Sequence, residues 1–101
     1  MQKSILKKIM EDVNLINRYV KEEEISYLHC TLWGLYEESK TKKILSVEEL
    51  KRLREMIDDI ISEESIYASI NIIKFVYDNF EALKNNKFAN DVVDFMVAQE
   101  K

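Results

Sequence analysis

The sequence predicts an all-α fold, a compact antiparallel bundle of four or five helices in a single domain spanning residues 1–101. Two observations support this prediction. The chain has one glycine and no proline, whereas the tight turns of β-hairpins usually need Gly, Pro or Asn-Gly. Its apolar residues also recur at steps of three and four, which is the period of one helix face. With 47% hydrophobic residues, a chain of 101 residues can form one core, and we expect no second domain.

The first two expected helices lie near the amino terminus. The stripe of the first consists of Ile5, Ile9, Val13, Ile16 and Val20. The stripe of the second follows the acidic run Glu22–Glu24 and consists of Ile25, Leu28, Leu32, Leu35 and Tyr36. Because Gly and Pro are absent here, residues 21–24 form either a short polar turn or a bend within one helix. Residues 37–45 have no helical period and are expected to form the longest loop.

The third expected helix has the best-marked boundary. Ser46 stands three residues before Glu49, which is the spacing of a capping box, so each side chain can bond the other's backbone amide. The helix then continues from Val47 to Ile61. Glu48 and Arg52 are placed to form a stabilising pair on its surface.

A fourth helix is expected to begin at Ser62 and to continue to Leu83, with carboxylates in its first turn. Its wide apolar stripe predicts that it is the central helix of the bundle. The pair Asn85-Asn86 is suited to a left-handed turn at its end. The last helix is expected to start after a cap at Asn90, with Phe88 packed against its entry.

No residues have the spacing of a catalytic, cofactor or metal site, so we expect a protein that is not an enzyme and binds no cofactor. His29 and Cys30 are adjacent, and neighbours on a helix point about 100° apart, so they do not converge on one ligand. Cys30 is expected to be buried or half-buried. One cysteine and no apolar run of about 20 residues favour a cytoplasmic protein with no membrane contact.

Charge is unevenly distributed along the chain. The net charge of -4 argues against general affinity for nucleic acid. Between residues 40 and 54 the chain is nevertheless basic, through Lys40, Lys42, Lys43, Lys51, Arg52 and Arg54. A nucleic-acid hypothesis would use this segment, but it has no interleaved aromatic residues. A solvated loop and helix face explains it more simply.

Acidic residues form the candidate partner-binding surface. They crowd the junction between the third and fourth expected helices, with a further pair at the start of the expected loop over residues 37–45, and Tyr67 follows the junction. The predicted binding residues are Asp58, Asp59, Glu63, Glu64, Tyr67, Glu37 and Glu38. Tyrosine beside charged residues is typical of protein interfaces. Trp33 lies at the edge of its stripe and is either a core or an interface residue.

The junction Asp58-Asp59-Ile60-Ile61-Ser62-Glu63-Glu64, followed by Tyr67, resembles that of small helical bacterial immunity proteins. These are acidic bundles that neutralise a bacteriocin or a contact-delivered toxin. The resemblance implies a cognate toxin domain as partner, basic in charge, such as a nuclease. The alternative is a helical adaptor or regulatory subunit that forms a homodimer through the apolar faces of its last two helices.

Overall fold

The computed structural model describes residues 2–11, 22–62 and 65–98, and for residues 22–23, 61–62, 65–70 and 97–98 it describes the backbone only. Every regular element in these ranges is a helix, so the predicted all-α class is confirmed. The described helices are α1 (Lys3–Glu11), α3 (Glu22–Lys42), α4 (Val47–Ser62), α5 (Ser65–Asp78), α6 (Phe80–Leu83) and α7 (Lys87–Ala98). Four or five helices were expected, and the additional element comes from a break after Asp78.

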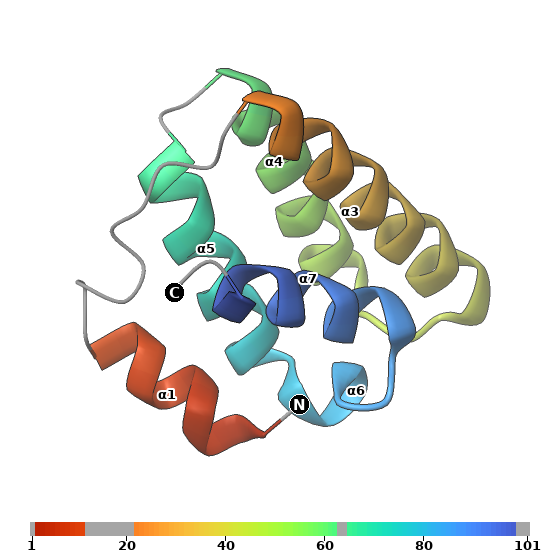
Figure 1. The fold of residues 1–101 in the computed structure, drawn as a ribbon. Coiled ribbons are helices and arrows are strands. Elements are labelled where there is room, and N and C mark those ends of the chain that lie inside the picture. Colours follow the sequence, from red (N-terminus) through yellow and green to blue (C-terminus); the bar gives the residue numbers. More distant parts are fainter. Residues whose placement is uncertain (1, 12–21, 63–64, 99–101) are drawn as a thin grey trace.

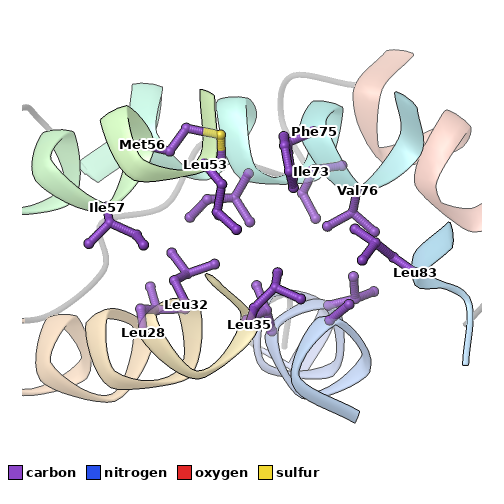
Figure 2. Close-up of a cluster of buried hydrophobic side chains, with 14 of the residues drawn as sticks. Leu28, Leu32, Leu35, Leu53, Met56, Ile57, Ile73, Phe75, Val76 and Leu83 are labelled. Atoms are coloured by element: carbon purple, nitrogen blue, oxygen red, sulfur yellow. The ribbon is translucent and has the colours of Figure 1, made fainter. Parts of the chain in front are cut away.

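The helices pack as two layers (Figures 1 and 2). Helices α3 and α7 form one layer and contact each other, while α4 and α5 form the other. The antiparallel hairpin of α3 and α4 joins the layers at one side of the molecule. Helix α5 contacts α1, α4, α6 and α7, which agrees with the central position predicted for it.

The core lies between the layers. Figure 2 shows Leu28, Leu32 and Leu35 of α3 pointing towards α4 and α5. They meet a second set of fully buried side chains, which includes Leu53, Ile57, Ile72, Ile73, Phe75 and Val76. Full burial of one such side chain stabilises the fold by about 1.5–3 kcal/mol. The apolar face of α3 and the facing side chains of α4 and α5 therefore hold the α3–α4 hairpin in place.

Helix α1 also contributes to this core, although Ile5, the first residue of its predicted stripe, does not. Leu6 and Ile9 are buried, whereas Ile5 is exposed. The rest of that stripe, from Val13 to Val20, lies outside the described residues. The buried face of α1 is turned towards α5.

Helix α3 extends further than the sequence suggested at both ends. Residues 22–24 form its first turn, while Lys21 lies outside the described residues. The loop expected over residues 37–45 is wrong, because α3 continues to Lys42. Ser39 is fully buried and Glu38 bonds Asn86 of α7, so tertiary contacts support a segment with little apolar periodicity.

The carboxyl end of α3 is a Schellman motif. Lys43 adopts a left-handed conformation with φ 54°, and the Ile44 amide donates to the Ser39 carbonyl at 3.0 Å. Glycine usually occupies such a position, because a side chain there costs about 1–2 kcal/mol. The chain therefore reverses direction over four residues with a lysine in the strained position.

The predicted cap of α4 forms in part. The Glu49 amide donates to Ser46 Oγ at 3.2 Å, as expected. The Glu49 carboxylate does not accept from the Ser46 amide in return. Glu49 Oε2 instead accepts from Asn79 Nδ2 at 2.9 Å and from Arg52. The pairing predicted between Glu48 and Arg52 is wrong, since Arg52 bridges Glu49 and Asp78. Contacts to the end of α5 have replaced the local ones.

The continuous helix expected up to Leu83 is interrupted at Asn79. Its side-chain amide donates to the Phe75 carbonyl at 3.0 Å as well as to Glu49, and the short helix α6 starts at the next residue. An asparagine in this position competes with the helical backbone for hydrogen bonds. The interruption turns the chain so that Leu83 is buried in the core.

The start of α7 also differs from the prediction. Asn86 is the capping residue, because its Oδ1 accepts from the Ala89 amide at 3.1 Å. The left-handed turn expected at Asn85-Asn86 is not found, and Asn90 lies inside the helix and bonds two backbone carbonyls. Phe88 also lies inside α7, where it packs across to α3.

The single glycine of the chain permits this packing. A Cβ atom at Gly34 would overlap the ring of Phe88, so α7 can lie this close to α3 only because position 34 has no side chain. Gly34 therefore lies inside a helix, where the missing side chain allows a close approach.

We predict that Gly34→Ala lowers the free energy of unfolding by about 1–3 kcal/mol, because the Phe88 ring must move out of a packed position. Urea unfolding followed by circular dichroism measures the change. In a Phe88→Leu background the same substitution should cost less. An equal loss in both backgrounds would show that the overlap is not the cause.

We predict that Lys43→Gly raises the free energy of unfolding by about 0.5–1 kcal/mol, since glycine adopts the left-handed conformation without strain. Thr41→Gly, two residues earlier in the helical part of α3, is the matched control and should be destabilising. Thermal and urea unfolding of both variants check the prediction, and equal signs would contradict it.

Candidate functional site

The antiparallel pairing of α3 and α4 determines which charged segments meet. In Figure 1 the orange start of α3 lies beside the green end of α4. The acidic run of residues 22–24 therefore shares one end of the hairpin with Asp58 and Asp59. The opposite end carries the reversal at residues 43–46 and the basic residues around it. We call the first the acidic end of the hairpin.

The structure describes part of the predicted binding surface. The side chain of Asp58 is exposed and accepts a hydrogen bond from Arg54, one helical turn earlier. Asp59 is half-buried and has no ion-pair partner within the described part of the chain. Glu63 and Glu64 lie outside the described residues. Tyr67 lies in α5, where the backbone alone is described.

Glu37 and Glu38 do not join this group. Glu37 lies six residues and Glu38 seven residues closer to the reversal than Asp58 does, about 9–10 Å along the hairpin, whereas residues 22–24 lie on the other side of Asp58, further from the reversal. Glu38 is half-buried, accepts from Asn86 Nδ2 at 3.0 Å and lies 3.8 Å from Lys42. Its contacts give it a role in holding α3 against α7. Glu37 is exposed.

The helix dipoles act in opposite senses on the two acidic segments of the acidic end. The backbone of residues 22–24 forms the first turn of α3, a position where the positive end of a helix dipole favours acidic residues. Asp58 and Asp59 lie near the carboxyl end of α4, whose last turn carries no basic residue. There the dipole opposes negative charge by about 0.3–1 kcal/mol per residue. The pair with Arg54 offsets the dipole at Asp58, so Asp59 is the carboxylate of this segment that helix stability does not explain.

A groove lies on the other half of the hairpin. It has a volume of about 610 Å³ and runs between the end of α3 and the first half of α4. Its lining residues are Tyr36, Lys40, Val47, Leu50, Lys51, Arg54 and Glu55. Apolar and aromatic groups form the floor and three cations stand at the rim. This combination suits a ligand that has both apolar groups and negative charge.

An aromatic cluster borders the groove. The rings of Trp33 and Tyr36 meet edge to face with centroids 5.6 Å apart, and the Arg54 guanidinium lies 4.6 Å from the Trp33 ring centroid. Trp33 Nε1 donates to His29 Nε2 at 3.2 Å. Trp33 is half-buried, packed against the core while its ring contacts Arg54. The contact with the core confirms one of the two roles that the sequence left open, and the interface role stays a prediction.

Sequence reasoning missed this arrangement because it searched for aromatic residues within the basic segment. The aromatics come from α3 and reach the basic residues of α4 only through the antiparallel pairing. The spacing of Trp33 and Tyr36, three residues apart on one helix face, was the available signal. Arg52, although part of the basic segment, points elsewhere and lies over the Phe75 ring.

His29 and Cys30 remain separate, as their adjacency predicted. Cys30 is exposed, which corrects the expectation of a buried or half-buried side chain. Within the described ranges no three His, Cys, Asp or Glu side chains gather as metal ligands. In those same ranges, no helix combines the length and apolar character needed to cross a membrane.

Ordinary surface pairing accounts for the shifted pKa of Glu81 on α6. Lys84 donates a hydrogen bond to this carboxylate at 2.9 Å, and its positive charge adds to the effect, so the pKa of Glu81 is lowered. The pair is exposed and three residues apart on one helix. It stabilises that turn and does not mark a catalytic group.

We predict that Arg54→Ala shifts the fluorescence emission of Trp33, the single tryptophan, to longer wavelength, because the guanidinium no longer covers the ring. The lost cation–π contact should also lower the free energy of unfolding by about 0.5–1 kcal/mol. Arg52→Ala is the matched control, since Arg52 contacts Phe75, Glu49 and Asp78. It should leave the emission unchanged, and identical spectra for Arg54→Ala and the unmodified protein would contradict the assignment.

The chain was compared with protein families, with characterised proteins and with solved structures. None of the three comparisons found a match. The candidate surfaces therefore rest on side-chain chemistry and on the placement of the helices. Two surfaces on one hairpin stand out, the acidic end and the groove.

Proposed function

We propose that the protein is a stoichiometric inhibitor of the immunity type, which binds a basic toxin domain through the acidic end of the α3–α4 hairpin. The observation that carries this proposal is the position of Asp58 and Asp59. These two carboxylates lie where the dipole of α4 opposes them, and Asp59 has no ion pair within the described ranges. The pair with Arg54 offsets this cost at Asp58, but helix stability does not explain Asp59, which a partner would explain.

The inhibition requires no chemistry by this chain. Carboxylates at one end of a hairpin attract a basic site over a distance and raise the rate of encounter. After contact, they compete with an anionic substrate for the same cations of the toxin. Tyr67, at the start of α5, is expected to supply an anchoring aromatic contact next to this acidic end. Such a complex blocks the toxin by covering its site.

The homodimeric adaptor is the weaker candidate. It relied on the apolar faces of the last two helices, and the described apolar side chains there largely face the protein's own core. Ile72, Ile73 and Val76 of α5 are at most 1% exposed, and Val92 and Val93 of α7 are at most 4% exposed. A dimer would have to use a different surface.

One observation supports nucleic-acid binding: the Trp33 ring contacts both Tyr36 and the basic residue Arg54 of α4. However, the groove carries three cations and one carboxylate, so few phosphates would be neutralised. The Trp33 ring already has Arg54 above it, which leaves less of its face for a base. The inhibitor therefore remains the better-supported proposal.

A growth experiment tests the proposal in the cell. The reading frame adjacent to the gene is expressed with and without this chain in a neutral host. We expect the carboxyl-terminal domain of the neighbouring product to stop growth, and we expect co-expression of this chain to restore it. Growth arrest that co-expression does not relieve would refute the proposal for that partner.

We predict that the double substitution Asp58→Lys and Asp59→Lys lowers the association rate constant with the purified toxin domain by about tenfold or more at low salt. The difference should shrink at high salt, because ions screen the attraction. Stopped-flow fluorescence measures both rate constants. Asp91→Lys with Asp94→Lys on α7 changes the net charge equally and is the control. Equal effects of the two pairs would show that total charge, and not the acidic end, drives association.

A further inference from the structure

We propose that the groove between α3 and α4 is a second docking surface, which binds an amphipathic helical segment of a protein partner that carries apolar side chains and carboxylates. The proposal goes beyond the inhibitor function, because it concerns the other half of the hairpin and a ligand of opposite charge. Two features of the groove support it: its floor and its rim.

The floor of the groove is apolar without serving the core. Val47, the first residue of α4, is 83% exposed, which is the highest value among the large exposed apolar residues. A β-branched residue in an exposed first turn gives little to a helix. Leu50 and Tyr36 beside it are only partly buried and lie at the edge of the core. The groove therefore offers apolar surface that the protein's own fold does not use.

Two of the three rim cations are not neutralised within the described part of the chain, whereas the third, Arg54, pairs with Asp58. Lys40 and Lys51 have no ion-pair partner within the described part of the chain. Other basic residues nearby do have partners, since Lys42 pairs with Glu38 and Arg52 with Glu49 and Asp78. Three basic side chains against Glu55 alone give the groove a positive balance in a chain with net charge -4.

Charge and shape together select the occupant. An amphipathic helix can place apolar side chains at steps of three and four on the floor while its flanking carboxylates meet Lys40, Lys51 and Arg54. A nucleic acid fits the groove less well, because its backbone has no apolar face for Val47 and Leu50. A second copy of this chain would bring a further net charge of -4 to the contact, and this repulsion opposes close association.

A synthetic probe tests the groove directly. The probe is a fluorescein-labelled amphipathic peptide of roughly four helical turns, with leucine on one face and glutamate on its flanks. A control peptide has lysine in place of every glutamate. Fluorescence anisotropy gives the affinity of each, and amide shifts of the ¹⁵N-labelled protein locate the contact. We expect the glutamate peptide to bind more tightly and to shift the amides of residues 47–55.

Two single variants change the groove without threatening the fold. Val47→Glu replaces an exposed side chain at a position where the α4 dipole favours a carboxylate, and Lys51→Glu alters an exposed residue. Each should weaken binding of the glutamate peptide by about tenfold. Lys74→Glu on α5 makes the same charge change as Lys51→Glu at another exposed site and should leave the affinity unchanged.

Three results would overturn the proposal. The first is equal binding of the lysine peptide, or amide shifts that lie away from residues 47–55. The second is tighter binding of single-stranded DNA, lost with Lys51→Glu, which would assign the groove to nucleic acid. The third is concentration-dependent dimerisation abolished by Val47→Glu, which would assign it to a second copy. The substitutions at positions 47 and 51 leave the residues of the acidic end unchanged, so the peptide measurements and the toxin measurements can fail separately.

Discussion

The burial of one face of α3 is the interaction on which the rest of this structure depends. Leu28, Leu32 and Leu35 are 0–2% exposed and lie between α4, α5 and α7 in Figure 2. Because this face is rigidly packed, the flanking faces of the helix have fixed directions. One flank carries Trp33 and Tyr36 towards α4. The other carries Gly34 and Glu38 towards α7.

The same constraint sets the distribution of charge. An antiparallel hairpin places the start of one helix beside the end of the next, so acidic residues separated by more than thirty positions share one end. The helix dipoles then act on them in opposite senses. A single hairpin consequently presents an acidic end and, about three helical turns away, an apolar groove with a basic rim. Both proposed contacts depend on the packing of α3 against α4.

Side-chain hydrogen bonds between layers decide where the helices end. Asn79 bonds Glu49 of α4 and stops α5, and Asn86 bonds Glu38 of α3 while it caps α7. Each asparagine therefore joins a helix boundary to a neighbouring helix. A change at either residue is expected to alter both the local boundary and the packing of two layers.

The sequence by itself determined the helical class, the buried stripes of α3, α4 and α5, and the cap at Ser46, because each depends on residues close together in the chain. It also identified the acidic residues at the end of α4. Tertiary structure decided the extension of α3 through residues 37–42, the break at Asn79 and the contact of Gly34 with Phe88. It also decided that Trp33 meets Arg54 and that Tyr36 lines the groove together with Lys51. These features rest on contacts between distant segments, and no local period or propensity encodes such contacts.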